Sequence, residues 1–240
     1  MLTQTIEKMN KMKLTAMSQS LEERLSKGDH RDFSVEDFIG LLVDDEYTTR
    51  SNRKIQRTLS RSNFGAENAC IENVDYTNAR GFTKSEILEY TKSTWITNKT
   101  NLIFTGQTGT GKTYLAEAIG KNACFMGYSA MKIRFKRLFE EIKMANVSGE
   151  YLKYLDKLIK VDVLILDDFL IQPVNGKEAL DLMEIIDSRM NLKSTIITSQ
   201  YPPANWHERL TDLTIADGIC DRLIHSSRLY LLKGPSMRKK

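Results

Sequence analysis

The residues best suited to chemistry form one glycine-rich stretch near the middle of the chain. It reads Gly106-Gln107-Thr108-Gly109-Thr110-Gly111-Lys112-Thr113 and meets the full G-x-x-x-x-G-K-[ST] pattern. Glycine permits backbone conformations closed to other residues, so successive N–H groups can turn toward phosphate oxygens. Lys112 adds a positive charge for the β and γ phosphates of a nucleotide, and Thr113 adds a hydroxyl suited to Mg²⁺. The stretch therefore predicts a site for a nucleotide and its magnesium ion.

The flanks of this stretch distinguish a binding loop from a turn that matches the pattern by chance. Residues 101–105 are mostly apolar, as expected of a short buried strand, and Tyr114 opens a helical pattern directly after the loop. Where a helix follows such a loop, its N-terminus adds a positive dipole end to the phosphate cradle. The flanks favour the binding loop, and Tyr114 joins the predicted nucleotide contacts.

Two neighbouring acids, Asp167 and Asp168, follow a second apolar run at residues 163–166. In an open parallel sheet ligands bind beyond the carboxyl ends of the strands, so both acids are expected beside the phosphate loop. We expect Asp167 to hold Mg²⁺ through its water shell, together with Thr113, and Asp168 to orient or deprotonate an attacking water. The competing interpretation is a pair of acids that only caps the next helix.

A third apolar run, residues 194–198, also ends in polar side chains. The same geometry predicts Thr198, Ser199 and Gln200 at this edge of the sheet, where the Gln200 amide can bond the γ phosphate or the attacking water. Farther on, Arg222 and Arg238 carry guanidinium groups of the kind that stabilises charge during phosphoryl transfer. Isolated arginines are more often ordinary surface residues, so the sequence pattern by itself does not assign these two to the site.

The elements needed to position these groups follow from the alternation of patterns after residue 100. Strands are expected near residues 101–105, 130–135, 162–166, 194–198 and 228–232, with helices up to about residues 125 and 157 and at 177–190. Such alternation predicts a central parallel sheet in a three-layer α/β/α fold, as in P-loop NTPases. Residues 101–240 form the predicted nucleotide domain, and residues 63–100 are predicted to be a connector that packs on it.

The first 62 residues are predicted to form a separate helical domain. Ser34, followed by Asp37 three residues later, is a helix start signal, and the helix it opens is expected over residues 35–61. No acid lies between Glu46 and Glu67, whereas the basic residues there are Arg50, Arg53, Lys54, Arg57 and Arg61. All but Arg53 are spaced by four, three and four, which aligns them on one helical face.

This basic stripe predicts contact with nucleic acid phosphates. The alternative is a solvated basic face, in which case two other surfaces are candidates for DNA contact. One is the region of the second strand, and the other is the C-terminus; their basic residues are Lys132, Arg134, Lys136 and Arg137, and residues 238–240.

Composition narrows the class of protein. The chain has 240 residues, 41% hydrophobic and 28% charged, with a net charge of +4, which is typical of a globular protein. It has no apolar run of membrane-spanning length and no signal-peptide pattern at its start, so a cytoplasmic protein with no membrane partner is expected. Three dispersed cysteines, Cys70, Cys124 and Cys220, argue against a disulfide framework or a zinc site.

Taken together, the motifs resemble those of the IstB-like helper ATPases of bacterial insertion sequences, which are AAA+ proteins similar to bacterial helicase loaders. The likeness runs over nearly the whole chain and is carried by TGQTGTGKT, VLILDDF, STIITSQYP, ANWHERL and LTIADGICDRLIHSSRLYLLKGPSMR. It implies an ASCE-type AAA+ core that hydrolyses ATP. It also implies oligomers on double-stranded DNA with shared ATP sites, and a partner transposase that the protein recruits and activates for insertion.

The resemblance also implies roles for single residues. Residues 106–113 match the nucleotide loop, Asp167 and Asp168 the magnesium and water-activating pair, and Gln200 the sensor at a strand tip. Arg222 matches an arginine finger inserted into a neighbouring subunit's site. Arg238 matches the sensor arginine of a terminal G-x-S-x-R motif.

Two departures from the general AAA+ pattern shape the expectations. Most AAA+ enzymes have Glu where this chain has Asp168, which is one methylene shorter, so a low turnover stimulated by DNA or a partner is expected. Few residues follow the last strand, so no C-terminal helical lid is expected.

A helicase loader of DNA replication is the alternative function. A small-molecule phosphotransferase is a third, disfavoured because neither an acceptor pocket nor an arginine-bearing lid is evident.

Overall fold

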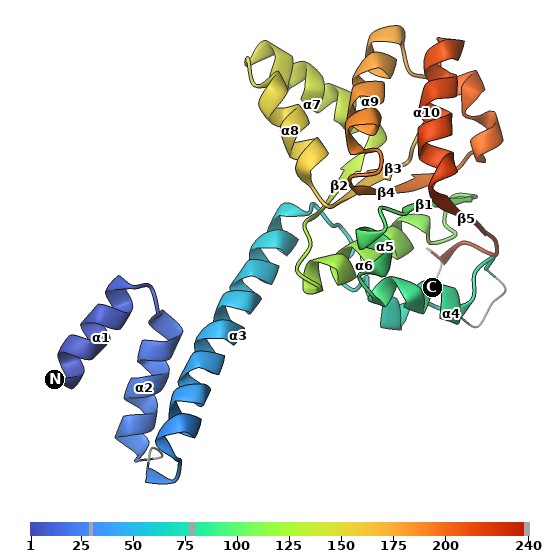
Figure 1. Cartoon of the computed structure of the whole chain (residues 1–240). Helices are drawn as coiled ribbons and strands as arrows, with labels where there is room; N and C mark the ends of the chain where they lie inside the picture. The colour runs from blue at the N-terminus through green and yellow to red at the C-terminus, as the bar shows by residue number, and fades with distance from the viewer. Residues whose placement is uncertain (29–30, 77–79, 238–240) are drawn as a thin grey trace. The chain divides into compact units, whose positions relative to one another are not determined.

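A computed structural model of the chain describes residues 1–28, 31–76 and 80–237 (Figure 1). The chain divides into two compact units, Met1–Arg57 and Thr58–Lys240. The division falls inside one helix, α3 (Val35–Arg61), which has the bounds expected from the sequence. In the described residues we find no helix that combines the length and the apolar character needed to span a membrane.

The first unit is built from α1 (Leu2–Lys11), α2 (Thr15–Lys27) and most of α3. Its third helix starts at Ser34 as predicted, because the Asp37 N–H donates to Ser34 Oγ at 3.1 Å. Glu46 is a buried acid on α3 that fastens the helices together. Its Oε2 accepts the backbone N–H groups of Ala16 and Met17 at 2.8 and 2.9 Å, at the start of α2.

The second unit contains a five-stranded sheet in the order β2-β3-β4-β1-β5, in which every neighbouring pair is parallel. The strands are β1 (Asn101–Gly106), β2 (Ala130–Arg134), β3 (Val163–Asp167), β4 (Ser194–Ser199) and β5 (Ser227–Leu232). All five predicted strands are confirmed. Because β1 lies between β4 and β5, the chain order reverses next to it, and the loop after β1 opens at this switch point.

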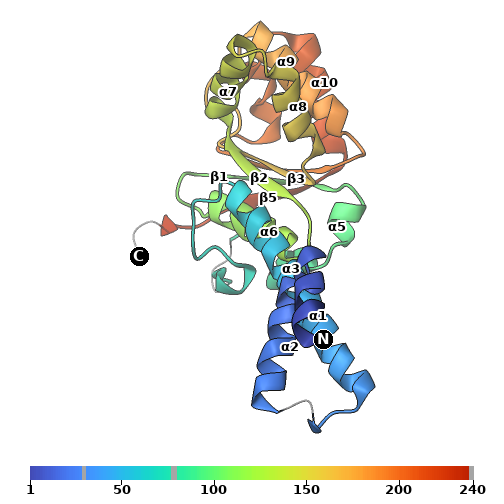
Figure 2. The ribbon, with the colours of Figure 1, turned by 90° about the vertical axis from the view of Figure 1, so that its left-hand side faces the viewer.

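Helices cover both faces of the sheet, which confirms the three-layer α/β/α prediction (Figures 1 and 2). One face carries α7 (Phe135–Val147), α8 (Tyr151–Lys160), α9 (Gly176–Arg189) and α10 (Leu213–His225). The other carries α6 (Lys112–Phe125) with the short α4 (Lys84–Leu88) and α5 (Thr94–Thr97). Strand alternation explains the two cores, since Ile103 belongs to the first and its neighbours Leu102 and Phe104 to the second.

Helix α10 is an element that the sequence analysis did not predict. It begins at Asp212, whose Oδ1 accepts the Ile215 N–H at 3.0 Å, and it buries one apolar face against the first core. Gly218 interrupts the helix-forming composition of this segment. Tertiary burial of Ile219, Cys220 and Leu223 outweighs that local cost.

The connector is fastened to α6 through a buried acid, Glu117. Its Oε2 accepts the N–H groups of Gly65 and Ala66 at 3.0 and 2.7 Å, and its Oε1 pairs with the Lys132 ammonium group. These bonds and the Lys132 charge lower the pKa of Glu117, although burial opposes the shift. The connector also contains two short 3₁₀ turns, Ile71–Asn73 and Glu89–Thr91. The second directly follows α4.

Arg189 should be among the residues on which stability most depends. It is 2% exposed, and its guanidinium donates to the carbonyls of Leu158, Val161 and Ser194 at 2.7, 2.8 and 2.5 Å; burial lowers its pKa to about 9. Because Arg189→Met leaves these carbonyls unpaired, we expect it to lower the free energy of unfolding by about 3 kcal/mol. Urea unfolding followed by circular dichroism measures this. A change below about 1 kcal/mol would mean that water replaces the guanidinium.

Candidate functional site

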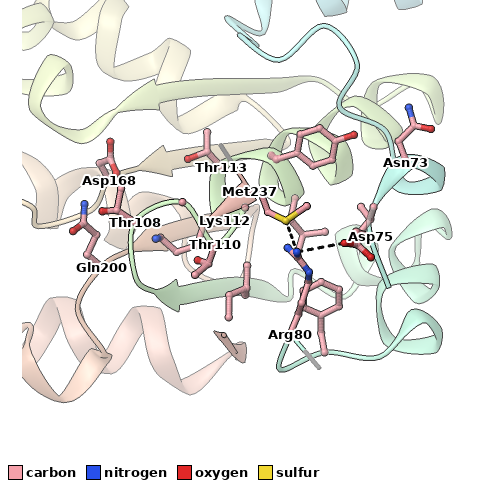
Figure 3. Close-up of a pocket in the computed structure, with 17 residues that line it drawn as sticks. Asn73, Asp75, Arg80, Thr108, Thr110, Lys112, Thr113, Asp168, Gln200 and Met237 are labelled. Atoms are coloured by element: carbon pink, nitrogen blue, oxygen red, sulfur yellow. Dashed lines mark hydrogen bonds and ion pairs between the residues drawn. The ribbon is translucent and has the colours of Figure 1, made fainter. Parts of the chain in front are cut away.

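The glycine-rich loop between β1 and α6 forms one wall of a cavity of about 600 Å³ (Figure 3). Four separate segments supply the other lining residues, which explains why no single motif describes the site. The cavity is lined by residues 108–115, by Asp168 and Gln200 beyond β3 and β4, by Asn73, Val74, Asp75, Arg80 and Phe82 of the connector, and by Leu232 and Met237.

The loop has the backbone that its glycines predict. Gly106, Gly109 and Gly111 have φ angles of +141°, +88° and +90°. A Cβ on Gly106 would lie 2.3 Å from the Leu232 carbonyl oxygen, so no side chain fits between the loop and β5. The dihedral angle thus favours glycine at all three positions, and at Gly106 and Gly109 the neighbouring atoms also leave no room for a Cβ.

Lys112 is the first residue of α6 and is buried beneath the loop. Its Nζ donates to the carbonyls of Gly106 and Gln107 at 2.7 and 2.9 Å. These two residues are not among those that line the cavity, and their carbonyls hold the lysine in place. Residues 108–114, also predicted to contact the nucleotide, do line it. The Lys112 charge thus lies where the loop and the helix N-terminus both favour an anion.

The two predicted magnesium residues meet at one end of the loop. Thr113 Oγ1 donates to Asp167 Oδ1 at 2.7 Å, and Thr198 Oγ1 donates to the same oxygen at 2.6 Å. A hydroxyl and a carboxylate are hard oxygen ligands, and Mg²⁺ binds through few protein groups while keeping several waters. The donor set fits magnesium, which Thr113 and Asp167 would hold. Among the described residues, no group of three or more acidic, His or Cys side chains is arranged so that it could hold a metal ion by itself.

Asp168 lines the cavity from a constrained turn. Its φ is +57°, in the left-handed region that a non-glycine residue adopts at some cost, and Leu170 follows at +54°. Strand β4 holds the turn, because Asp168 N–H donates to Thr198 Oγ1 at 3.1 Å and Phe169 N–H donates to the Thr198 carbonyl at 2.8 Å. Arg209 donates to the carbonyl of Leu170 as well. The surrounding structure therefore fixes where this acid stands.

The three remaining predicted site residues differ from one another in their position relative to the cavity. Gln200 follows β4 and lines the cavity together with Asp168, and Figure 3 shows both at the left of the view, opposite Asp75. Arg222 lies on α10, is not among the lining residues, and donates from Nε to Asp187 Oδ1 at 2.6 Å. Arg238 lies outside the described residues.

Several residues that line the cavity were not predicted from the sequence. Asn73, Asp75, Arg80 and Phe82 come from the connector, which carries no motif, and Met237 follows β5. Met237 approaches the loop directly, since its N–H donates to the Gly109 carbonyl at 2.8 Å. For the connector residues the signal was the general expectation that the connector packs on the nucleotide domain, and for Met237 it was the terminal G-x-S-x-R motif that contains it.

The basic stripe on α3 is exposed at each of its residues, Arg50, Arg53, Lys54, Arg57 and Arg61. Arg50 and Arg53 have contacts in the first unit with partners that can be named. Arg50 pairs with Glu46 at 2.6 Å and donates to the Lys13 carbonyl at 2.7 Å, and Arg53 donates to Thr15 Oγ1 at 3.3 Å. Arg50 and Arg53 thus have structural contacts in addition to their exposed charge.

Thr198 joins the two aspartates through one hydroxyl group, which gives a specific prediction. We expect Thr198→Val, which keeps the shape of the side chain, to slow hydrolysis about 10-fold while nucleotide affinity changes little, because Asp167 and the Asp168 turn both lose a hydrogen bond. Steady-state phosphate release and calorimetric titration measure the two quantities. Thr195→Val, on the same strand, serves as the control, and equal losses in both variants would contradict the prediction.

Comparison with solved structures identifies proteins that share this fold. The chain resembles the DnaC helicase loader, with a TM-score of 0.60 and 24% identity over 70% of this chain and 98% of that one. It also resembles DnaI, with a TM-score of 0.62 and 24% identity over 72% and 97% of the two chains, and AMPPCP-bound DnaA from Aquifex aeolicus, with a TM-score of 0.61 and 18% identity over 73% and 54%. These likenesses support the predicted AAA+ P-loop fold.

Comparison of sequences extends over both units. The chain is 36% identical over 235 residues to the insertion sequence ATP-binding protein y4pL of Sinorhizobium fredii, covering 98% of this chain and 96% of that one. It is also 36% identical over 203 residues to the ATP-binding protein of insertion sequence IS1162 of Pseudomonas fluorescens, covering 84% and 88%. The model of the IstB-like ATP binding protein family matches residues 7–240. This chain therefore belongs to the IstB-like ATP-binding protein family.

Proposed function

We propose that this protein is an ATPase that assists transposition. It binds Mg²⁺-ATP on the glycine-rich loop, assembles on double-stranded DNA and recruits and activates a transposase for insertion. The main support is the meeting of Thr113 and Asp167 at 2.7 Å beside the loop, with Asp168 and Gln200 on the same cavity. The insertion sequence relatives supply the link to transposition.

The chemistry follows from the placement of each group. N–H groups of the loop and the Lys112 ammonium bind the β and γ phosphates. Magnesium, held by Thr113 and Asp167, would neutralise charge that develops on the phosphates. Gln200 orients a water molecule, Asp168 accepts its proton, and the water oxygen bonds the γ phosphorus as the bond to the β-phosphate oxygen breaks. ADP leaves with that oxygen, and inorganic phosphate carries the water oxygen.

In this proposal an arginine from a neighbouring subunit completes the site. Arg222 would approach the γ phosphate of the next copy, which couples hydrolysis to assembly. Conversion of ATP to ADP would then change the stability of the subunit interface, and with it the affinity of the assembly for DNA.

Calorimetric titration of the full chain with ATP in the presence of Mg²⁺ tests the ATP binding on which the whole proposal depends. We expect binding by the wild-type protein and its loss in Lys112→Ala, with phosphate release stimulated by duplex DNA. Lys160→Ala, on the exposed surface of α8, is the matched control. Absence of ATP binding by folded wild-type protein would refute the proposal.

A helicase loader is the second candidate, favoured by the likeness of the fold to the DnaC loader. The two functions differ in partner, so purified protein is mixed with a transposase encoded beside it and with a replicative ring helicase. Retention of the transposase alone supports transposition. Retention of the helicase alone supports loading.

The basic stripe gives a prediction about DNA. We expect Arg57→Ala and Arg61→Ala to weaken binding to all duplex sequences alike, and each to reduce the slope of log K against log salt by about 0.9, because each arginine neutralises one phosphate. Fluorescence anisotropy at several salt concentrations measures the slope. Lys160→Ala should leave it unchanged. An unaltered slope in both arginine variants would move the DNA surface to the Lys132–Arg137 region or elsewhere.

A further inference from the structure

Arg80 is a buried cation in the cavity wall that the chemistry above does not use. Its side chain is 5% exposed and comes from the connector (Figure 3). Among the described residues its Nη2 meets Asp75 Oδ2 at 3.5 Å and donates to the Met237 sulfur. Its Nε is buried, and no described residue accepts a hydrogen bond from it.

These partners are weak for a guanidinium group. The Asp75 contact is at the outer limit of a hydrogen bond, and a thioether sulfur is a poor acceptor. A guanidinium offers five N–H donors in a planar fork, and burial removes the water that would otherwise satisfy them. The groups that best match such a fork are those with two anionic oxygens in one plane, carboxylates and phosphates.

The position of the group selects the phosphate. A Cβ on Gly111 would lie 3.8 Å from Arg80 Nη1, so the guanidinium stands beside the phosphate loop. Figure 3 shows Arg80 on the side of the cavity that also carries Asp75, away from Asp168 and Gln200, where the γ phosphate would react. Arg80 therefore faces the part of a nucleotide that hydrolysis leaves unchanged.

We propose that Arg80 binds the nucleotide through a phosphate that ADP retains. This rests on the proposed function, since it assigns a residue to the same site. A contact to a phosphate that hydrolysis leaves unchanged is made equally to ATP, to the transition state and to ADP. Such uniform binding lowers KM and the Kd of ADP without raising kcat. Arg80 is thus a nucleotide-binding residue of the connector.

Titration of the full-length Arg80→Met variant with ATP, ADP and GTP tests this inference. We expect affinities for ATP and ADP to fall by the same factor, about 10-fold to 100-fold, since a charge-assisted hydrogen bond is lost. The preference for ATP over GTP and the kcat at saturating ATP should stay within about twofold, as uniform binding requires. Arg137→Met, an exposed arginine of α7 paired with Glu141, is the control and should bind as the wild type does.

Three results would overturn the assignment: unchanged affinities, a loss confined to ATP, or a changed preference between ATP and GTP. The second would assign Arg80 to the γ phosphate, and the third to the base. Should Arg80→Met not fold, Arg80→Lys keeps the charge without the fork and is expected to bind ATP and ADP several-fold more weakly, so wild-type affinity in that variant also overturns the inference. Tight binding by the wild-type protein with an unaffected Arg80→Met refutes only this inference. Absence of binding by the wild type refutes the proposed function.

Discussion

Asp168→Asn should lower the rate of ATP hydrolysis by about 100-fold or more while ATP affinity stays within about threefold. The amide cannot accept the proton of the attacking water, and general base catalysis contributes at least about two orders of magnitude. Asparagine also tolerates the φ of +57° observed at this position, so the turn after β3 should persist. Single-turnover phosphate release measures the chemical step, and calorimetry with ATP and Mg²⁺ measures binding.

The matched control for this variant is Asp156→Asn, an exposed acid of α8 that is paired with Lys160. It should hydrolyse ATP at the wild-type rate. Hydrolysis by Asp168→Asn within tenfold of the wild type would place the proton acceptor elsewhere. A loss of ATP affinity as large as the loss of rate would make Asp168 a binding group and not a base.

Arg222→Ala should reduce hydrolysis in the DNA-bound assembly by about 1000-fold, the effect usual for an arginine finger. Arg222 does not line the cavity of its own subunit, so its expected site of action is the γ phosphate of a neighbour. ATP binding by the isolated variant should therefore remain. Phosphate release at saturating duplex DNA gives the rate, and titration without DNA gives the affinity.

Mixing variants distinguishes a shared site from a structural role. An Arg222→Ala subunit still supplies Asp168, and an Asp168→Asn subunit still supplies Arg222, so their mixture should contain some complete sites and regain activity. Asp187→Asn keeps the arginine but removes the negative charge of its 2.6 Å partner on α9, and it should retain most of the activity. A mixture no more active than either variant alone would refute the shared site.

The parts of this structure that the sequence predicts are those where local pattern and fold agree. The loop glycines need positive φ values, and the two aspartates and Gln200 follow apolar strands. In a parallel sheet, strand ends that follow one another in space must meet at the same edge, so the site could be assembled from three distant motifs. The pairing of Thr113 with Asp167 follows from that rule.

The remaining features depend on contacts that no local pattern records. Arg80 lines the cavity because the connector folds across α6, and nothing in its neighbours in sequence indicates this. Helix α10 was missed because Gly218 lowers its helix propensity, although Asp212 and the apolar residues after it formed a usable signal. The stripe on α3 looked free of acids, but Glu46 lies one turn before Arg50 and pairs with it.

The left-handed backbone at Asp168 means that thermal stability and catalytic activity favour different residues at this position. Glycine adopts that conformation without the cost that a Cβ brings, so Asp168→Gly is expected to raise the melting temperature while it removes the proposed proton acceptor. A library of variants sorted only for survival on heating should therefore enrich glycine at this position and yield durable but inert proteins. Thermostabilisation of this fold needs a screen for turnover alongside the one for survival.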